Sequence, residues 1–172
     1  MDKVCCIILN YNDASTTMSL VDEIREYNCL DSIVVVDNCS TDGSWKQLKA
    51  LRDLDKVHVL RTEENGGYGS GNQAGIDYAV TYLEAGYVII ANPDIHVRAC
   101  CIERVKLALD GMPEAVMASA RVTSPEGGDL FSYWTLLPMW KDLLDTGLIT
   151  RRLFKPMLNT PAYRFKEGGD EG

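Results

Sequence analysis

The chain of 172 residues is 46% hydrophobic and 24% charged, and its 25 acidic and 17 basic side chains give a net charge of -8. This length and composition are typical of one folded domain with an apolar core, and they exclude disordered, collagen-like and membrane-spanning proteins. The acidic balance argues against a nucleic-acid partner, because surfaces that bind nucleic acids are basic.

Short apolar runs alternate with segments of helical periodicity along the first 120 residues. In chain order, the predicted elements are a strand at 4–9, a helix at 15–30, a strand at 32–37, a helix at 44–54, a strand at 57–60, a helix at 70–85, a strand at 87–92, a helix at 99–109 and a strand at 115–122. In the first helix, for example, Met18, Val21 and Ile24 recur at helical spacing. This alternation predicts an α/β fold of three α/β/α layers with a mostly parallel central sheet.

The alternation stops after residue 122, so residues 1–122 are predicted to form the α/β core. Residues 123–129 are predicted to be a loop, and residues 130–158 are rich in Trp, Leu, Met, Arg and Lys. Together, residues 123–158 are predicted to be a partial acceptor-side or covering segment, and the polar residues 159–172 are predicted to be a flexible tail. The aromatic run at 134–140 and the basic residues after it favour a covering helix. A peripheral contact with a membrane surface or a lipid-linked acceptor is the alternative.

Six cysteines occur without the spacing of a zinc site, and four of them form adjacent pairs. The apolar run at the start of the chain is shorter than that of a signal peptide. We therefore expect reduced thiols and a cytoplasmic protein, in which Cys5 and Cys6 act as small core residues.

Polar residues follow each of the first four predicted strands. They lie at Asn10–Asp13, Asp37–Ser44, Glu63–Asn72 and Asn92–Asp94. Parallel strands end at the same edge of a sheet, and ligands of α/β proteins bind in the crevice beyond that edge. One polar strand end is ordinary loop chemistry, but four at one edge indicate a binding site.

Two aspartates follow the second strand and are expected to play different roles. Asp37 leaves a buried strand, so we expect its carboxylate to contact the base or ribose of a ligand, with an Asx turn as the alternative. Asp42 directly precedes the next helix, and we expect it to cap the amide groups at the start of that helix.

Four glycines lie within Asn65–Asn72, just where a helix is predicted to begin. Glycine lets a backbone approach a ligand closely, and helix-start amides favour an anion such as a diphosphate. Gly69–Ala74 also matches the dinucleotide fingerprint G-x-G-x-x-[G/A], with Asp94 as a downstream ribose contact. This alternative, an NAD-type oxidoreductase, is disfavoured because the fingerprint should follow the first strand and here follows the third.

The segment Asn92-Pro93-Asp94 ends the fourth strand, because Pro93 cannot extend a ladder of hydrogen bonds. An aspartate beside a diphosphate loop is well placed to hold Mg²⁺ or Mn²⁺, since these hard cations take carboxylate and phosphate oxygens. A plain Asn-Pro-Asp turn is the alternative.

In order and spacing, four segments resemble the inverting family-2 glycosyltransferases, which have the nucleotide-diphosphosugar transferase fold called GT-A. The segments are VCCIILNYND, IVVVDNCSTDGS, ENGGYGSGNQAGI and VIIANPDI. The resemblance is close over residues 3–97 and looser over 98–122. The NPD form of the last segment is most similar to the rhamnosyltransferase branch of the family.

The resemblance implies a role for each matching position. Tyr11, with the backbone of Asn10 and Asn12, matches the loop that binds the base, and Asp37 and Asn38 match the pair that contacts base and ribose. The positions implied to lie near the diphosphate and the sugar are Asn65, Gly66, Gly67, Tyr68 and Asn72.

Asn92 and Asp94 match the two ends of the family's D-x-D metal motif. Because the first acid is an amide in this chain, Asp94 is the only strong metal ligand that the resemblance implies. The implied reaction moves a sugar, with rhamnose as a candidate, from a dTDP- or UDP-linked donor to a glycan or lipid-linked acceptor. It proceeds by direct displacement with inversion while a carboxylate deprotonates the acceptor hydroxyl.

No carboxylate downstream has the context of the family's catalytic base. The acids in that part of the chain are Asp142, Asp145, Glu167, Asp170 and Glu171. The chain therefore looks short at its C-terminus for this family, and we assign no catalytic base. A truncated or inactive module that still binds a nucleotide sugar is the alternative function.

Overall fold

The computed structural model describes residues 2–123 and 129–130. The chain divides into two compact units, Met1–Ala118 and Ser119–Gly172. In the second unit, β5 (Val122–Thr123) pairs antiparallel with β6 (Asp129–Leu130). The predicted tail at 159–172 and most of the predicted covering segment at 123–158, including the run at 134–140, lie outside the described residues.

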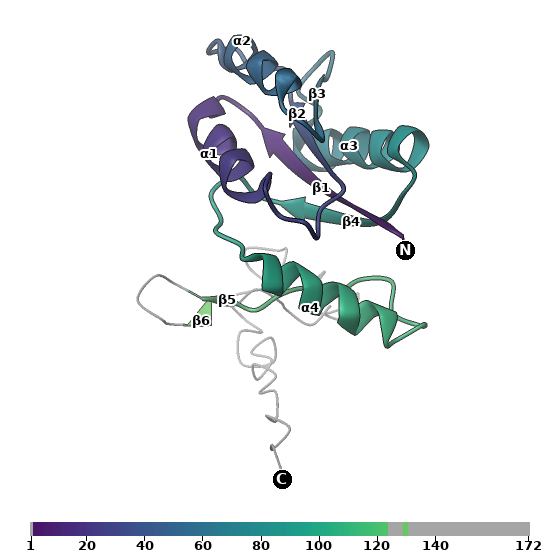
Figure 1. The fold of residues 1–172 in the computed structure, drawn as a ribbon. Coiled ribbons are helices and arrows are strands. Elements are labelled where there is room, and N and C mark those ends of the chain that lie inside the picture. The colour runs from purple at the N-terminus through teal and green to yellow at the C-terminus, as the bar shows by residue number, and fades with distance from the viewer. Residues whose placement is uncertain (1, 124–128, 131–172) are drawn as a thin grey trace, which may run out of the picture. The chain divides into compact units, whose positions relative to one another are not determined.

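The first unit is built around a four-stranded sheet (Figure 1). Its strands are β1 (Lys3–Asn10), β2 (Ser32–Asp37), β3 (Val57–Arg61) and β4 (Ala85–Ala91). They lie in the order β3-β2-β1-β4, and every neighbouring pair is parallel. The chain moves outward from β1 to β3 and then returns to the other side of β1, so the strand order reverses between β1 and β4. Such a reversal is where α/β sheets bind ligands.

Helices cover both faces of this sheet, which confirms the predicted three-layer fold. The helices are α1 (Ala14–Ile24), α2 (Ser44–Leu48), the 3-10 helix η1 (Lys49–Asp53), α3 (Gly67–Leu83) and α4 (Ala99–Asp110). Alternate residues of β1 point to opposite sides: Cys6 and Ile8 join the core under α1, α2 and α4, and Ile7 joins the core under α3. None of the described helices is long and apolar enough to cross a membrane.

The adjacent cysteines of β1 are core residues, as predicted. Cys5 and Cys6 are buried on opposite faces of the sheet, and all six cysteines of the chain are free thiols. Burial raises the pKa of Cys6 to about 12, because the apolar surroundings disfavour the thiolate. This thiol therefore stays protonated and packs as a small apolar side chain.

Three predicted helices end earlier in the structure than predicted, and the one at 70–85 differs least: it is α3, which ends at Leu83. The predicted helix at 15–30 stops at Ile24, after which tight turns bond the amide of Tyr27 to Ile24 and the amide of Leu30 to Tyr27. Both side chains still contribute to the core, which is why the apolar periodicity continues past the end of the helix. The predicted helix at 44–54 tightens into a 3-10 helix after Leu48.

The predicted fifth strand at 115–122 is wrong. Residues 115–121 lie in no strand, and only Val122 belongs to a strand, the two-residue β5. The side chain of Val116 is 97% exposed, so the apolar run does not mark burial here. Alanine accounts for three of the residues in this stretch, and alanine is poor in strands because it offers little side chain to pack.

Replacing either of two glycines of α3 by alanine is expected to have opposite effects on the stability of the fold. A Cβ at Gly75 would lie 2.6 Å from Cγ2 of Ile7, so G75A is expected to destabilise the fold by about 1–2 kcal/mol through overpacking. A Cβ at Gly69 meets nothing within 4 Å, so G69A is expected to stabilise the fold by about 0.5 kcal/mol by reducing the freedom of the unfolded chain. Urea unfolding of both variants measures the two changes. Equal effects would contradict the close packing of α3 on β1.

Candidate functional site

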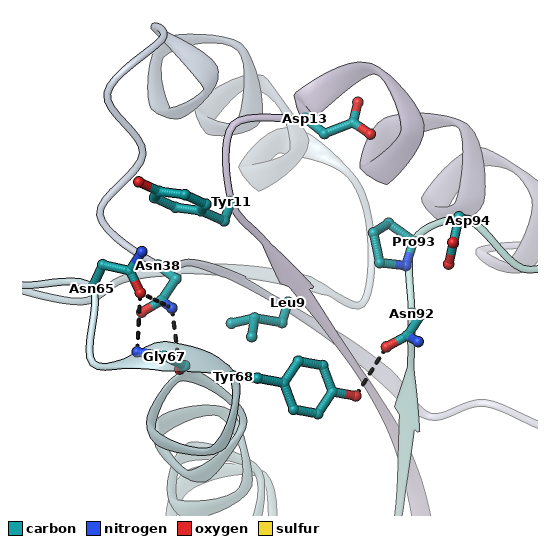
Figure 2. Close-up of a pocket in the computed structure, with 10 residues that line it drawn as sticks. All are labelled: Leu9, Tyr11, Asp13, Asn38, Asn65, Gly67, Tyr68, Asn92, Pro93 and Asp94. Carbon is teal, nitrogen blue, oxygen red and sulfur yellow. Dashed lines mark hydrogen bonds between the residues drawn. The ribbon is translucent and has the colours of Figure 1, made fainter. Parts of the chain in front are cut away.

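A cleft of about 560 Å³ opens at the reversal point of the sheet, beyond the ends of β1, β2 and β4 (Figure 2). Its walls consist of Leu9, Tyr11, Asp13, Asn38, Asn65, Gly67, Tyr68, Asn92, Pro93 and Asp94. The polar strand ends therefore do meet in one place. Among the predicted site residues, those that do not line the cleft are Asn10, Asn12, Asp37, Gly66 and Asn72.

Three polar residues form a row across the strands beside the cleft, which we call the buried row because two of its members, Asn10 and Asp37, are buried, whereas Arg61 is exposed. In the sheet register, Asn10 lies opposite Asp37, and Asp37 lies opposite Arg61, so the row crosses β1, β2 and β3. The amide of Asn10 donates to Oδ1 of Asp37 at 2.9 Å, and Nε of Arg61 lies 3.4 Å from Oδ2. Asn10 and Asp37 are both 0% exposed. Direct contact between Asp37 and a ligand stays a prediction, and in this structure the carboxylate is bound within the protein.

The same row organises the loop after β1. Oγ of Ser40 accepts a hydrogen bond from the side chain of Asn10 and another from the backbone N–H of Asn12. The side chain of Asn12, whose φ is 55°, in turn accepts from the backbone of Thr41 at 2.8 Å. These bonds hold the loop on either side of Tyr11, whose side chain is 49% exposed and lines the cleft.

A second set of bonds fixes the cleft wall formed by the glycine loop. The side-chain amide of Asn38 donates to Oδ1 of Asn65 at 2.8 Å and to the backbone O of Gly67 at 3.2 Å. The N–H of Gly67 returns a bond to Oδ1 of Asn65 at 3.0 Å. Gly67 has a φ of +83°, a backbone conformation that residues other than glycine rarely adopt. Asn38 thus joins the end of β2 to the start of α3.

Opposite this wall lie the residues at the end of β4. The side chain of Tyr68 extends from the start of α3 toward Asn92, and its hydroxyl donates to Oδ1 of Asn92 at 2.9 Å (Figure 2). Asp94 is exposed at the far end of the cleft. Asn72 is buried one turn after Tyr68 and donates to its backbone O, and its own Oδ1 has no hydrogen-bond partner among the described residues.

Asp13 lines the cleft, although the sequence reasoning gave it no role of its own within the polar strand end Asn10–Asp13. Its carboxylate accepts from the backbone N–H of Thr16 and the hydroxyl of Ser15, so it caps α1. These hydrogen bonds hold the pKa of Asp13 below its usual value because they favour the charged form. The available signal was an aspartate directly before a helical segment. Asp42 accepts from the N–H of Ser44, the first residue of α2, as its predicted role requires, although the N-cap position itself is occupied by Gly43.

The chemistry of the cleft fits a divalent cation that arrives with its ligand. No group of three or more His, Cys, Asp or Glu side chains that could hold a metal occurs among the described residues. Mg²⁺ and Mn²⁺ are commonly held by one or two carboxylates together with the phosphates of a nucleotide. Asp94 can supply such a carboxylate, whereas Oδ1 of Asn92 already accepts a bond from Tyr68.

The dinucleotide alternative does not match the backbone. Gly69–Ala74 lies within α3, which follows β3, and Gly71 packs its Cα against Leu9 of β1, where any Cβ would clash. In a dinucleotide-binding fold these glycines would form the tight turn directly after the first strand. Here Gly71 allows the close packing of α3 on the sheet, whereas Gly69 has open space around it.

Comparison with known families agrees with this geometry. The family model for glycosyl transferase family 2 matches residues 5–164. The chain belongs to glycosyl transferase family 2. The resemblance seen in the sequence is thus confirmed at the level of the family.

Curated relatives match more than half of this family 2 chain. It is 30% identical over 97 residues to the low-salt glycan biosynthesis hexosyltransferase Agl10 of Haloferax volcanii, covering 56% of this chain and 29% of the relative. It is 30% identical over 111 residues to the dTDP-rhamnosyl transferase RfbF of Shigella flexneri, covering 63% of this chain and 35% of the relative. The matches thus span about a third of the length of these relatives.

Solved structures share the fold of the family 2 chain. The mannosyltransferase PcManGT from Pyrobaculum calidifontis, in complex with GDP-Man and Mn²⁺, aligns with a TM-score of 0.61 at 20% identity, covering 73% of this chain and 36% of that one. TarS of S. aureus, in complex with UDP-GlcNAc, aligns with a TM-score of 0.50 at 21% identity, covering 63% and 31%. At such identities the likeness concerns the fold alone.

Proposed function

We propose that this chain binds a nucleotide diphosphate sugar in the cleft and transfers the sugar to an acceptor hydroxyl. The observation that carries the proposal is the cleft itself. At the reversal point of a parallel sheet it combines an exposed aromatic ring at Tyr11, an amide-bonded glycine loop and a carboxylate at Asp94. Residues 1–122 are then the donor-binding core.

The two ends of the cleft suit the two ends of a nucleotide diphosphate. Tyr11, Asn38 and Asn65 offer a ring face and amide groups to the base and ribose. Asp94, at the other end, would hold Mg²⁺ or Mn²⁺ together with the diphosphate oxygens, and the bound ion would offset the charge that grows on the leaving diphosphate. The acceptor hydroxyl attacks the anomeric carbon, its proton passes to a base, and the bond to the diphosphate breaks with inversion.

In our proposal, none of the residues that the structure describes is assigned as the catalytic base. The downstream acids Asp142, Asp145, Glu167, Asp170 and Glu171 lie outside the described part of the chain. The donor is proposed to be a dTDP- or UDP-linked sugar, with rhamnose supported by the match to RfbF and by the NPD segment. A glycan or lipid-linked acceptor and a cytoplasmic site, at or near the inner face of the membrane, complete the proposal.

Calorimetry with UDP, dTDP, GDP and NAD, each with and without Mn²⁺, tests the proposal. A nucleoside diphosphate should bind more tightly when Mn²⁺ is present, because the ion bridges Asp94 and the phosphates. Release of sugar from the matching nucleotide sugar then tests the chemistry. Binding of NAD alone, without any nucleoside diphosphate, would overturn the proposed donor site.

Tyr11 provides a separate test of where the base binds. Stacking of a nucleic-acid base on an aromatic side chain contributes roughly 1–3 kcal/mol. We therefore expect Y11A to weaken nucleotide affinity by about 10-fold or more and Y11F to retain most of it. The control is the free energy of unfolding, which should change little because the ring is half exposed. If Y11A and the wild type bind the nucleotide with equal affinity, the Tyr11 ring does not contact the base.

A further inference from the structure

The loop that follows Asp94 is tied to the α1 segment by two side chains. Oε1 of Glu23, on α1, accepts from the backbone N–H of Val97 at 3.3 Å, and Oε2 lies 2.8 Å from Nδ1 of His96. The hydroxyl of Tyr27, just beyond α1, donates to the backbone O of Val97 at 3.1 Å. Both backbone groups of Val97, three residues after Asp94, are therefore held: the N–H from α1 and the C=O from the turn after α1.

Apolar packing also holds the loop against the core beside α1. Ile95 and Val97 pack partly against the core under α1, whereas Asp94 and His96 are exposed. The alternation places the carboxylate of Asp94 on the outer side of the loop. A slip of the loop by one residue would turn Asp94 away from the cleft, and the bonds at Val97 oppose such a slip.

Asp94 itself has open space on two sides. It lines the large cleft and also a second hollow of about 390 Å³ between α1 and the loop, whose walls include Glu23 and His96. No residue of the described part of the chain donates a hydrogen bond to its carboxylate. Its position therefore depends on the backbone that carries it, and Glu23 is the charged side chain that reaches that backbone across the hollow.

We propose that Glu23 and Tyr27 are positioning residues that hold Asp94 where a metal–diphosphate complex meets the cleft. Neither side chain lines the large cleft, so neither is expected to touch the base or ribose. The inference rests on the proposed function, since it takes Asp94 as the metal ligand. Groups that orient metal-binding carboxylates commonly change metal affinity by 10-fold or more when they are removed.

The test measures how much Mn²⁺ strengthens nucleotide binding, using whichever of UDP, dTDP and GDP binds the wild type best. E23A is expected to lower this Mn²⁺-dependent gain by roughly 10-fold and to leave metal-free affinity unchanged. E23Q keeps an oxygen for the N–H of Val97 and should restore most of the gain. Y27F, which removes one oxygen atom, should lower the gain with little effect on thermal unfolding.

The control variant is D22A, which removes a neighbouring exposed carboxylate of α1 that pairs with Arg25. It should keep the full Mn²⁺-dependent gain. If Mn²⁺ strengthens nucleotide binding by E23A and by Y27F as much as it does for the wild type, the positioning role is overturned while the proposed function stays intact. If the wild type binds nucleotide without any response to Mn²⁺, the metal role of Asp94 fails, and the positioning role fails with it.

Discussion

Replacing Asp94 by alanine is expected to abolish the gain in nucleotide affinity that Mn²⁺ provides and to slow sugar transfer by about 100-fold or more. Asp94 is the carboxylate at the proposed diphosphate end of the cleft, and Asn92 offers only a neutral oxygen that already accepts from Tyr68. Without Asp94, the ion has the phosphates and water as its ligands. Calorimetry with and without Mn²⁺, followed by a transfer assay, measures both effects.

The matched control removes a different negative charge from the same cleft. Asp13 also lines the cleft, but its carboxylate caps α1, and asparagine can serve as a cap equally well. D13N should therefore keep the response to Mn²⁺, whereas D94N should lose it. If D13N and D94N weaken the response equally, the cleft attracts the ion by its overall charge and Asp94 is not a specific ligand.

The position of the site could be predicted because it follows from topology. Strands of β-branched residues separated by helical segments force a parallel sheet, and a parallel sheet brings the ends of all its strands to one edge. Tyr11, Asn38, Asn65 and Asp94 come from four different strand ends, and all four line the same cleft. The predicted edge needed no knowledge of which strands are neighbours.

The roles of individual residues within the site depended on sheet register, which the sequence does not contain. Asn10 and Tyr11 are adjacent polar residues where β1 ends, yet Asn10 is buried and Tyr11 faces the cleft. Asn10 faces Asp37 only because β1 and β2 pair in the observed register. A carboxylate that looked like a ligand contact is therefore bound to its neighbours beside the cleft.

The failed strand at 115–122 has a related cause. An apolar run forms a strand only where a partner strand or a covering helix buries its side chains. The runs in β1 and β2 have neighbours on both sides, whereas Val116 and Met117 are exposed in this structure. The two side chains are apolar but not buried, and the pattern of apolar residues alone cannot tell a buried run from an exposed one.

The buried row beside the cleft predicts the largest loss of stability. Asp37 is fully buried, accepts from Asn10, and pairs with Arg61, whose side chain is 36% exposed. D37A should lower the free energy of unfolding by about 3 kcal/mol, because one N–H of the Asn10 amide loses its acceptor and the Arg61 guanidinium loses its carboxylate partner. D37N keeps an oxygen for Asn10 and loses only the charge, so its loss should be smaller. Urea unfolding of the two variants gives the order.

The control is D42N, five residues along the same loop, where asparagine preserves the exposed cap on α2 and stability should match the wild type. Nucleotide affinity of folded D37N then separates two roles for Asp37. If Asp37 only supports the loop around Tyr11, affinity should fall little while stability falls. If it also contacts the base or ribose, affinity should fall by about 10-fold, since a hydrogen bond to a charged group contributes roughly 1.5–3 kcal/mol. A D37A variant as stable as D42N would contradict the buried row.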